Sequence, residues 1–196
     1  MEGELARLVV GLGNPGPKYA GTRHNVGFLA VERLVLDCGE TWSCAQPGPG
    51  ETSRVRLGGG TDVRLIKPHT YMNASGDMVS SFAGYFKIPH HAVLVVADDF
   101  NLPLGRIRIR KKGSSGGQNG LDSILRRFGS QDVPRVRLGI GPVPPQYDPA
   151  DFVLGRFAKS DADELDDMIS RAADAIRVCC EKGITAAMNG FNGEAA

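Results

Sequence analysis

A run of six apolar residues that ends at two aspartates constrains the fold more than any other feature of this sequence. Ala92–Ala97 contains only alanine, valine and leucine, and Asp98 and Asp99 follow it directly. Such a run is typical of a strand buried on both faces, because a strand with one solvated face alternates polar and apolar residues. We therefore expect a sheet covered by helices on both sides, with two carboxylates where this strand ends.

The remaining periodicity predicts strands and helices in alternation along one chain. Further strands are expected at about residues 8–11, 52–57, 62–66, 104–112 and 135–140. The segment 142–149 is predicted to be a Pro-rich loop. We predict one α/β domain over residues 1–196, with a mixed central β-sheet flanked by helices. The helices are expected at Asn25–Asp37, along Met78, Val79, Phe82, Tyr85 and Phe86, along Leu121–Phe128 before Gly129, and from a Ser160 cap to a Gly183 stop.

The composition is that of a globular protein. Hydrophobic residues make up 41% of the chain, and the formal net charge is +1. No apolar run approaches the roughly 18 residues of a membrane span, so no membrane partner is expected. The first residues resemble neither a signal peptide nor a transit peptide, which favours a cytoplasmic location.

Four cysteines show no spacing typical of a metal site or a disulfide framework. The last two, Cys179 and Cys180, close the apolar stripe of the final predicted helix. We therefore expect reduced, mostly buried thiols and no metal. The other two are Cys38 and Cys44.

Charge is distributed unevenly along the chain. Between Arg106 and Arg137 nine basic residues stand against only Asp122 and Asp132, whereas residues 148–182 contain nine acids and five bases. A basic segment of this kind favours contact with a phosphate backbone. The acidic C-terminal helix is expected to face away from that partner.

The segment GLGNPG at residues 11–16 matches the GxGxxG pattern of dinucleotide-binding proteins. Pro15 and Pro17, however, stand where a helix should begin, and each removes an amide that a phosphate would need. A dinucleotide cofactor is therefore disfavoured, and no cofactor is expected. A purely structural turn explains the glycines but leaves Asn14, His24 and Asn25 unexplained.

Polar side chains follow several predicted strands. Because ligands of α/β sheets lie beyond the carboxyl ends of the strands, we expect Asn14, His24, Asn73 and Asp98 to converge. A carboxylate can fix the tautomer of an imidazole that takes a proton from water. With amides near the carbonyl, this set could hydrolyse an ester without metal or cofactor. The alternative of a surface histidine, capping asparagines and a structural aspartate stays open.

Five motifs together resemble those of the bacterial-type peptidyl-tRNA hydrolases. They occur in order and with similar spacing from Leu8 to about Phe157, which makes them far more specific than any one motif. The motifs are GLGNPG with Tyr19 and TRHNVG near the start, KPHTYMNASG at residues 67–76, DDFNLPLG at 98–105, GGQNG at 116–120 and PRVRLGIG at 134–141.

The resemblance implies a monomeric enzyme that hydrolyses the ester joining a peptide to the terminal ribose of tRNA. By position, it makes His24 the general base on water and Asp98 its partner. It places Arg110 and Arg137 as a basic pair for a phosphate at the acceptor end of the tRNA. It also implies that Asn14, Asn73 and Asn119 hold the peptide and the terminal adenosine and orient the attack, and that Tyr19, Asn25 and Met72 line the same crevice.

Gln118 departs from the family pattern, which usually has histidine there. Glutamine donates and accepts hydrogen bonds but cannot carry the proton, so Gln118 is a candidate for substrate binding and not for acid catalysis. A change in rate is expected rather than a loss of activity. A second function also stays open, a non-catalytic RNA-binding protein on the same fold, as in the plant organellar splicing factors.

Overall fold

The apolar run lies in β5 (Val93–Pro103), an inner strand of the sheet. In the computed structural model, which describes residues 5–193, β5 has a parallel neighbour on each side, β1 (Leu8–Gly11) and β7 (Arg135–Gly141). Every residue from Val93 to Asp99 is buried. The predicted strand buried on both faces is confirmed.

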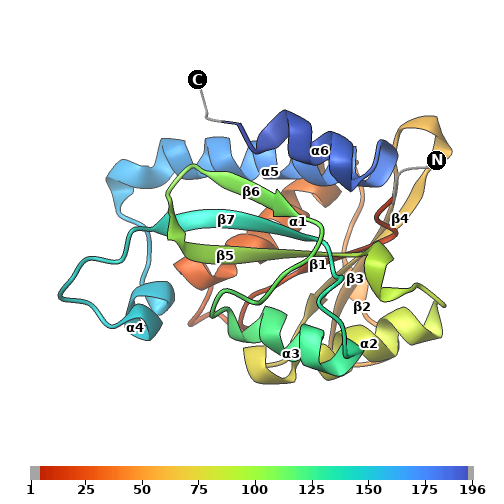
Figure 1. Cartoon of the computed structure of the whole chain (residues 1–196), viewed down its shortest axis with the longest axis horizontal. Helices are drawn as coiled ribbons and strands as arrows, with labels where there is room; N and C mark the ends of the chain where they lie inside the picture. The colour runs from red at the N-terminus through yellow and green to blue at the C-terminus, as the bar shows by residue number, and fades with distance from the viewer. Residues whose placement is uncertain (1–4, 194–196) are drawn as a thin grey trace.

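One mixed sheet of seven strands runs through the described residues (Figure 1). Its other members are β2 (Ser43–Cys44), β3 (Gly50–Arg56), β4 (Asp62–Pro68) and β6 (Ile107–Arg110). The strand order is β2-β3-β4-β1-β5-β7-β6. Strands β4, β1, β5 and β7 are parallel, and the other three pair antiparallel. The parallel strands therefore end at one edge of the sheet, where ligands of such folds bind.

Helices cover both faces of this sheet (Figure 1). The helices α1 (Val26–Asp37), α5 (Ala162–Glu181) and α6 (Ile184–Phe191) pack on one face, and α2 (Ser75–Tyr85) and α3 (Asn119–Phe128) on the other. Because successive strand residues point to opposite faces, β1 sends Val9 into the first layer and Leu8 and Val10 into the second. The predicted α/β fold, a mixed central sheet flanked by helices, is confirmed.

The expectation that the buried strand ends at Asp98 was wrong. β5 continues to Pro103, because β7 supplies neighbours opposite Asp98, Asp99 and Pro103. Both aspartates therefore lie within a strand and are buried. Carboxylates in such a place need hydrogen-bonding partners, and the structure provides them at the candidate site.

The Pro-rich segment is a loop only as far as Asp148. The carboxylate of Asp148 accepts a hydrogen bond from the Ala150 amide at 2.8 Å and caps α4 (Pro149–Leu154). Proline is favourable at the first position of a helix because its missing N–H has no helical partner there. The Asp-Pro pair was therefore a helix-start signal that the prediction of a loop overlooked.

The predicted cap of the last long helix was also wrong. Ser160 lies in a separate 3-10 turn (Lys159–Asp161), and α5 begins after that turn at Ala162. The predicted stop is confirmed, since Gly183 follows the helix with φ 93°. Beyond it the chain forms α6, which was not predicted.

Two of the four cysteine thiols are buried, so the expectation of mostly buried thiols is met only in part. Cys179 and Cys180 lie in the core, where burial raises the pKa of the Cys179 thiol to about 12. Cys38 is half-buried, but Cys44 is exposed on β2, the outermost strand. The prediction for Tyr85 was wrong, since its side chain is exposed although Phe82 and Ala83 in the same turn of α2 are buried.

Gly27 lets α1 lie against the ends of β1 and β5. A β-carbon there would collide with the carbonyl oxygens of Leu12 and Val96. We expect Gly27→Ala to lower the free energy of unfolding by about 1–3 kcal/mol, the cost of overpacking, as measured by urea denaturation. Gly84→Ala in α2 is the matched control, because a β-carbon there meets nothing within 4 Å and should stabilise by about 0.5–1 kcal/mol. Equal stability of both variants would contradict this.

Candidate active site

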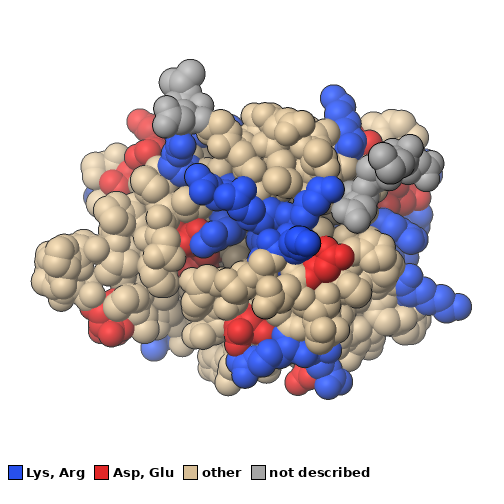
Figure 2. Space-filling view, in the orientation of Figure 1, with Lys and Arg blue, Asp and Glu red and all other residues tan. Residues whose placement is uncertain are grey.

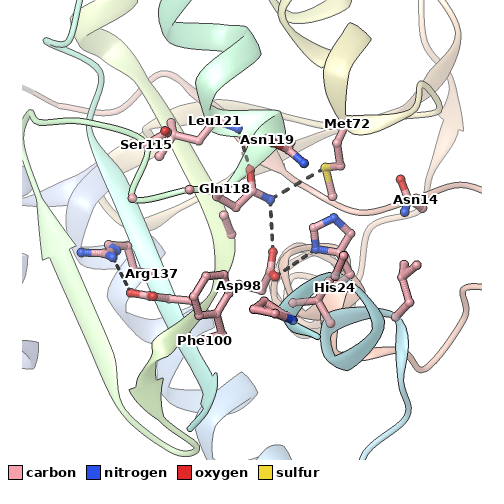
Figure 3. Close-up of a pocket in the computed structure, with 18 of the residues that line it drawn as sticks. Asn14, His24, Met72, Asp98, Phe100, Ser115, Gln118, Asn119, Leu121 and Arg137 are labelled. Carbon is pink, nitrogen blue, oxygen red and sulfur yellow. Dashed lines mark hydrogen bonds and ion pairs between the residues drawn. The ribbon is translucent and has the colours of Figure 1, made fainter. Parts of the chain in front are cut away.

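His24 and Asp98 meet at the edge of the sheet where the parallel strands end. His24 lies in a 3-10 turn (Arg23–Asn25) ahead of α1, and Asp98 projects from β5. The Nδ1 atom of His24 is 2.9 Å from Oδ2 of Asp98, and both side chains are buried (Figure 3). An ionised carboxylate only accepts hydrogen bonds. The contact therefore favours a proton on Nδ1 and leaves Nε2 able to accept one.

Asn14 is held at the rim of this site by Asn25. The Asn14 amide donates to Oδ1 of Asn25 at 2.9 Å, and Nδ2 of Asn25 donates back to the Asn14 carbonyl at 3.0 Å. Both residues are buried. Since these bonds use the main chain of Asn14, its side-chain amide is left to face the neighbouring space.

Gln118 contacts the second oxygen of Asp98. Its Nε2 donates to Oδ1 of Asp98 at 3.1 Å and lies 3.8 Å from the sulfur of Met72. Its Oε1 accepts from the Leu121 amide at 2.7 Å, so Gln118 is also the N-cap of α3. The cap fixes which end of the amide faces Asp98. The carboxylate therefore has a donor on each oxygen, His24 on one and Gln118 on the other.

These groups line one cavity of about 560 Å³. Residues predicted from the sequence supply much of its wall, namely Asn14, His24, Met72, Asn73, Asp98, Gln118, Asn119 and Arg137. Three other predicted residues are not among those that line it. Asn25 lies behind Asn14, Tyr19 is half-buried in the loop before the histidine turn, and Arg110 is exposed on the edge strand β6.

Two arginines of β7 stand at the other side of the cavity from Asn14. Arg137 forms an ion pair with Asp99, Nη2 to Oδ2 2.7 Å (Figure 3). Arg135 is buried and donates to the carbonyls of Gly113, Ser114 and Val133. Burial, together with nearby Arg137, lowers the pKa of Arg135 to about 10. Arg135 thus anchors the glycine-rich loop that leads to Gln118.

The register of the last two strands gathers four arginines on one face. Arg108 lies opposite Arg137, and Arg110 lies opposite Arg135. Figure 2 shows lysines and arginines gathered over this part of the molecule. We call these four arginines the basic face. The predicted pair of Arg110 and Arg137 belongs to it, although the two are not cross-strand neighbours.

Comparison with known proteins identifies the family. A model of the family described as peptidyl-tRNA hydrolase matches residues 8–196. The chain belongs to the peptidyl-tRNA hydrolase family. A peptidyl-tRNA hydrolase of Elusimicrobium minutum is 48% identical over 188 residues, which cover 96% of this chain and 100% of the relative. One of Fervidobacterium nodosum is 47% identical over 187 residues, with 94% and 95% covered.

The fold of this chain also matches that of a solved peptidyl-tRNA hydrolase. The crystal structure of peptidyl-tRNA hydrolase from Acinetobacter baumannii matches with a TM-score of 0.90 at 34% identity. The match covers 98% of this chain and 97% of the other. The family predicted from the five motifs is therefore confirmed, and the fold is shared over nearly the whole length.

Several cavity residues of this family member were not predicted from the sequence. Tyr71 and Phe100 lie beside predicted residues, and α4 contributes Pro149, Val153 and Leu154. The start signal at Asp148 and Pro149 could have revealed the helix. The position of α4 over the cavity depends on packing between segments far apart in sequence. For example, the guanidinium group of Arg23 stacks on the ring of Phe152 in α4, 4.3 Å from its centre.

Residues 5–193 contain neither a metal-binding cluster nor a membrane-spanning helix. In this part of the chain no group of three or more His, Cys, Asp or Glu side chains is arranged to hold a metal ion. None of its helices combines the length and the apolar character needed to cross a bilayer.

Proposed function

We propose that this protein hydrolyses the ester between a peptide and the 3'-terminal ribose of tRNA, with His24 as the general base and Asp98 as its partner. The activity is that of the peptidyl-tRNA hydrolase family, to which the chain belongs. The observation that carries the residue assignment is the 2.9 Å contact between Nδ1 of His24 and Asp98 inside a cavity lined by amides.

The proposed reaction begins with a water molecule beside Nε2 of His24. As the water oxygen bonds to the ester carbonyl carbon, Nε2 takes a proton from it, and Asp98 stabilises the imidazolium that forms. The tetrahedral intermediate then collapses with cleavage of the bond to the ribose oxygen. That oxygen recovers the proton from His24, so the products are a free peptide acid and a tRNA with a free terminal ribose.

The amides around the cavity are proposed to orient the substrate. Asn14, Asn73 and Asn119 line it from three different segments, and amide N–H groups stabilise the negative charge that develops on a carbonyl oxygen. Met72 supplies an apolar wall, and Asn25 acts through Asn14. Gln118 is proposed to position Asp98. A binding role for Tyr19 stays a prediction from the resemblance, since Tyr19 is not among the cavity residues.

The family acts on peptidyl-tRNA, and we propose that the basic face receives the phosphates of its acceptor end. We expect Arg137→Ala and Arg110→Ala each to raise the KM for peptidyl-tRNA and to lower the slope of log KM against log salt by about 1. Lys182→Ala is the control, because this exposed lysine follows α5 outside the basic face. Unchanged KM and salt slope in both arginine variants would overturn this assignment.

One assay tests the proposed activity directly. Purified protein is mixed with N-acetylaminoacyl-tRNA, and the release of the acetylated amino acid is followed with time. Catalytic turnover supports the hydrolase, whereas tight binding without turnover would indicate the alternative of a non-catalytic RNA-binding protein, which the comparisons do not favour. We further propose that the enzyme acts as a monomer in the cytoplasm, where translation supplies its substrate.

A further inference from the structure

A second cavity, of about 280 Å³, begins where the first one ends. Asn14 lines both of them. Asn25 and Phe28 form one part of the wall of the second cavity, and Glu32, Glu51 and Lys67 form another. These last three residues come from α1, β3 and β4. The mechanism proposed above uses none of them.

The second cavity carries more negative than positive charge. Lys67 is buried, and its Nζ lies 2.7 Å from Oε1 of Glu32 and 2.7 Å from Oε2 of Glu51. The hydrogen bond from Lys67 lowers the pKa of Glu51, which keeps it ionised at neutral pH. The two carboxylate side chains are 41% and 37% exposed, against 7% for the lysine. An incoming ligand therefore meets two carboxylates before it meets the ammonium group.

His69 also faces this cluster. Its Nε2 lies 3.3 Å from Oε2 of Glu51, and the residue lines the same cavity. Two carboxylates, Glu32 and Glu51, stand against one ammonium group, Lys67, so the formal charge of these three residues is −1. The more exposed groups of the cluster are the two carboxylates, so a ligand that enters the cavity meets negative charge first.

The strand order gives the second cavity its place relative to the substrate. Asp98 lies in β5, and the turn that carries His24 packs beside it. The basic face lies on β7 and β6 to one side of β5, and Lys67 and Glu51 lie on β4 and β3 to the other. Figure 3 shows Arg137 and Asn14 on opposite sides of the histidine and aspartate. A substrate whose tRNA covers the basic face must direct its peptide past Asn14.

We propose that the second cavity is a subsite for the peptide part of the substrate, and that Glu32 and Glu51 make it prefer basic over acidic residues. This inference rests on the proposed function. An extended peptide advances about 3.3–3.6 Å per residue, so residues close to the ester already reach beyond Asn14. Their side chains meet the exposed carboxylates, which attract a lysine and repel a glutamate.

The test compares substrates that differ only in one peptide side chain. One tRNA is esterified with N-acetylated Ala-Ala-Ala or with the same tripeptide carrying Lys, Gln or Glu at its first or second position. We expect kcat/KM to be roughly two- to fivefold higher for Lys than for Glu at one of these positions, the range of solvent-exposed ion pairs, with Gln between them. Added salt should reduce the ratio.

Variants identify the groups responsible for the preference. Glu32→Gln and Glu51→Gln should each move the Lys-to-Glu ratio toward one, while each leaves the other carboxylate paired with Lys67. Because the ratio is taken within one variant, a general loss of activity does not affect it. Glu40→Gln, at an exposed site outside the cavity, should keep the ratio of the parent.

The outcomes separate this inference from the proposed function. Failure to cleave the all-alanine substrate would refute the hydrolase itself. Normal cleavage of that substrate with equal rates for Lys and Glu at both positions would refute the subsite alone. A preference that persists in both glutamine variants would likewise overturn the assignment to Glu32 and Glu51.

Discussion

Replacing His24 with alanine is expected to lower the rate of ester hydrolysis by roughly 10²–10⁴-fold, the usual contribution of a positioned general base. Binding of peptidyl-tRNA should change little, because the basic face and the cavity amides remain. Single-turnover release of an acetylated peptide measures the chemical step, and fluorescence anisotropy with a labelled tRNA measures binding. The effect should therefore appear in kcat with the dissociation constant nearly unchanged.

A surface histidine provides the matched control. His91 is exposed and lies away from the cavity, so His91→Ala should match the parent in both measurements. Equal turnover by the His24→Ala variant and the parent would contradict the assignment of the base. Loss of binding in step with loss of turnover would instead make His24 a docking residue.

That His24 and Asp98 would lie close together was predictable, because it follows from local sequence patterns and one rule of sheet topology. The buried run before Asp98 marked an inner strand, and the glycine turn after β1 marked a second strand end. Parallel strands end at the same edge of a sheet. His24 and Asp98 could thus be expected to meet although they are 74 positions apart in the sequence. In the structure Nδ1 of His24 lies 2.9 Å from Oδ2 of Asp98.

Which arginines lie opposite one another across β6 and β7 was not predictable in the same way. Alternation along residues 104–112 predicted that the basic residues share one face of a strand. This is confirmed for Arg108 and Arg110 alone, because β6 covers only Ile107–Arg110. Which of them lies opposite Arg137 depends on the pairing of β6 with β7, and the structure selects Arg108. A sequence pattern fixes the face that a side chain occupies, but a partner across the sheet depends on register between distant segments.

The role of Gln118 also depends on contacts that its motif does not contain. The resemblance to the family implied only that glutamine stands where a histidine that could carry a proton is usual. The structure shows that the Leu121 amide holds Oε1, which turns Nε2 toward Asp98. This orientation has a consequence for any residue that replaces the aspartate.

Asp98→Asn is expected to reduce turnover by roughly 10²–10⁴-fold, although the side chains have the same shape. Because Gln118 donates to one oxygen of Asp98, asparagine must keep its oxygen on that side. Its NH₂ group then faces Nδ1 of His24 and donates to it. The imidazole proton moves to Nε2, which can no longer accept a proton from water.

The paired variant Asp98→Asn with Gln118→Glu tests this orientation argument. A glutamate at position 118 can still cap α3 with one oxygen and accept from the asparagine with the other, so the asparagine turns its oxygen toward Nδ1 of His24. We expect the double variant to recover part of the turnover lost in Asp98→Asn, although Gln118→Glu alone should slow the enzyme by placing two carboxylates together. Steady-state hydrolysis of N-acetylaminoacyl-tRNA by the four proteins measures this coupling. A double variant no faster than Asp98→Asn would show that Gln118 does not set the histidine tautomer through residue 98.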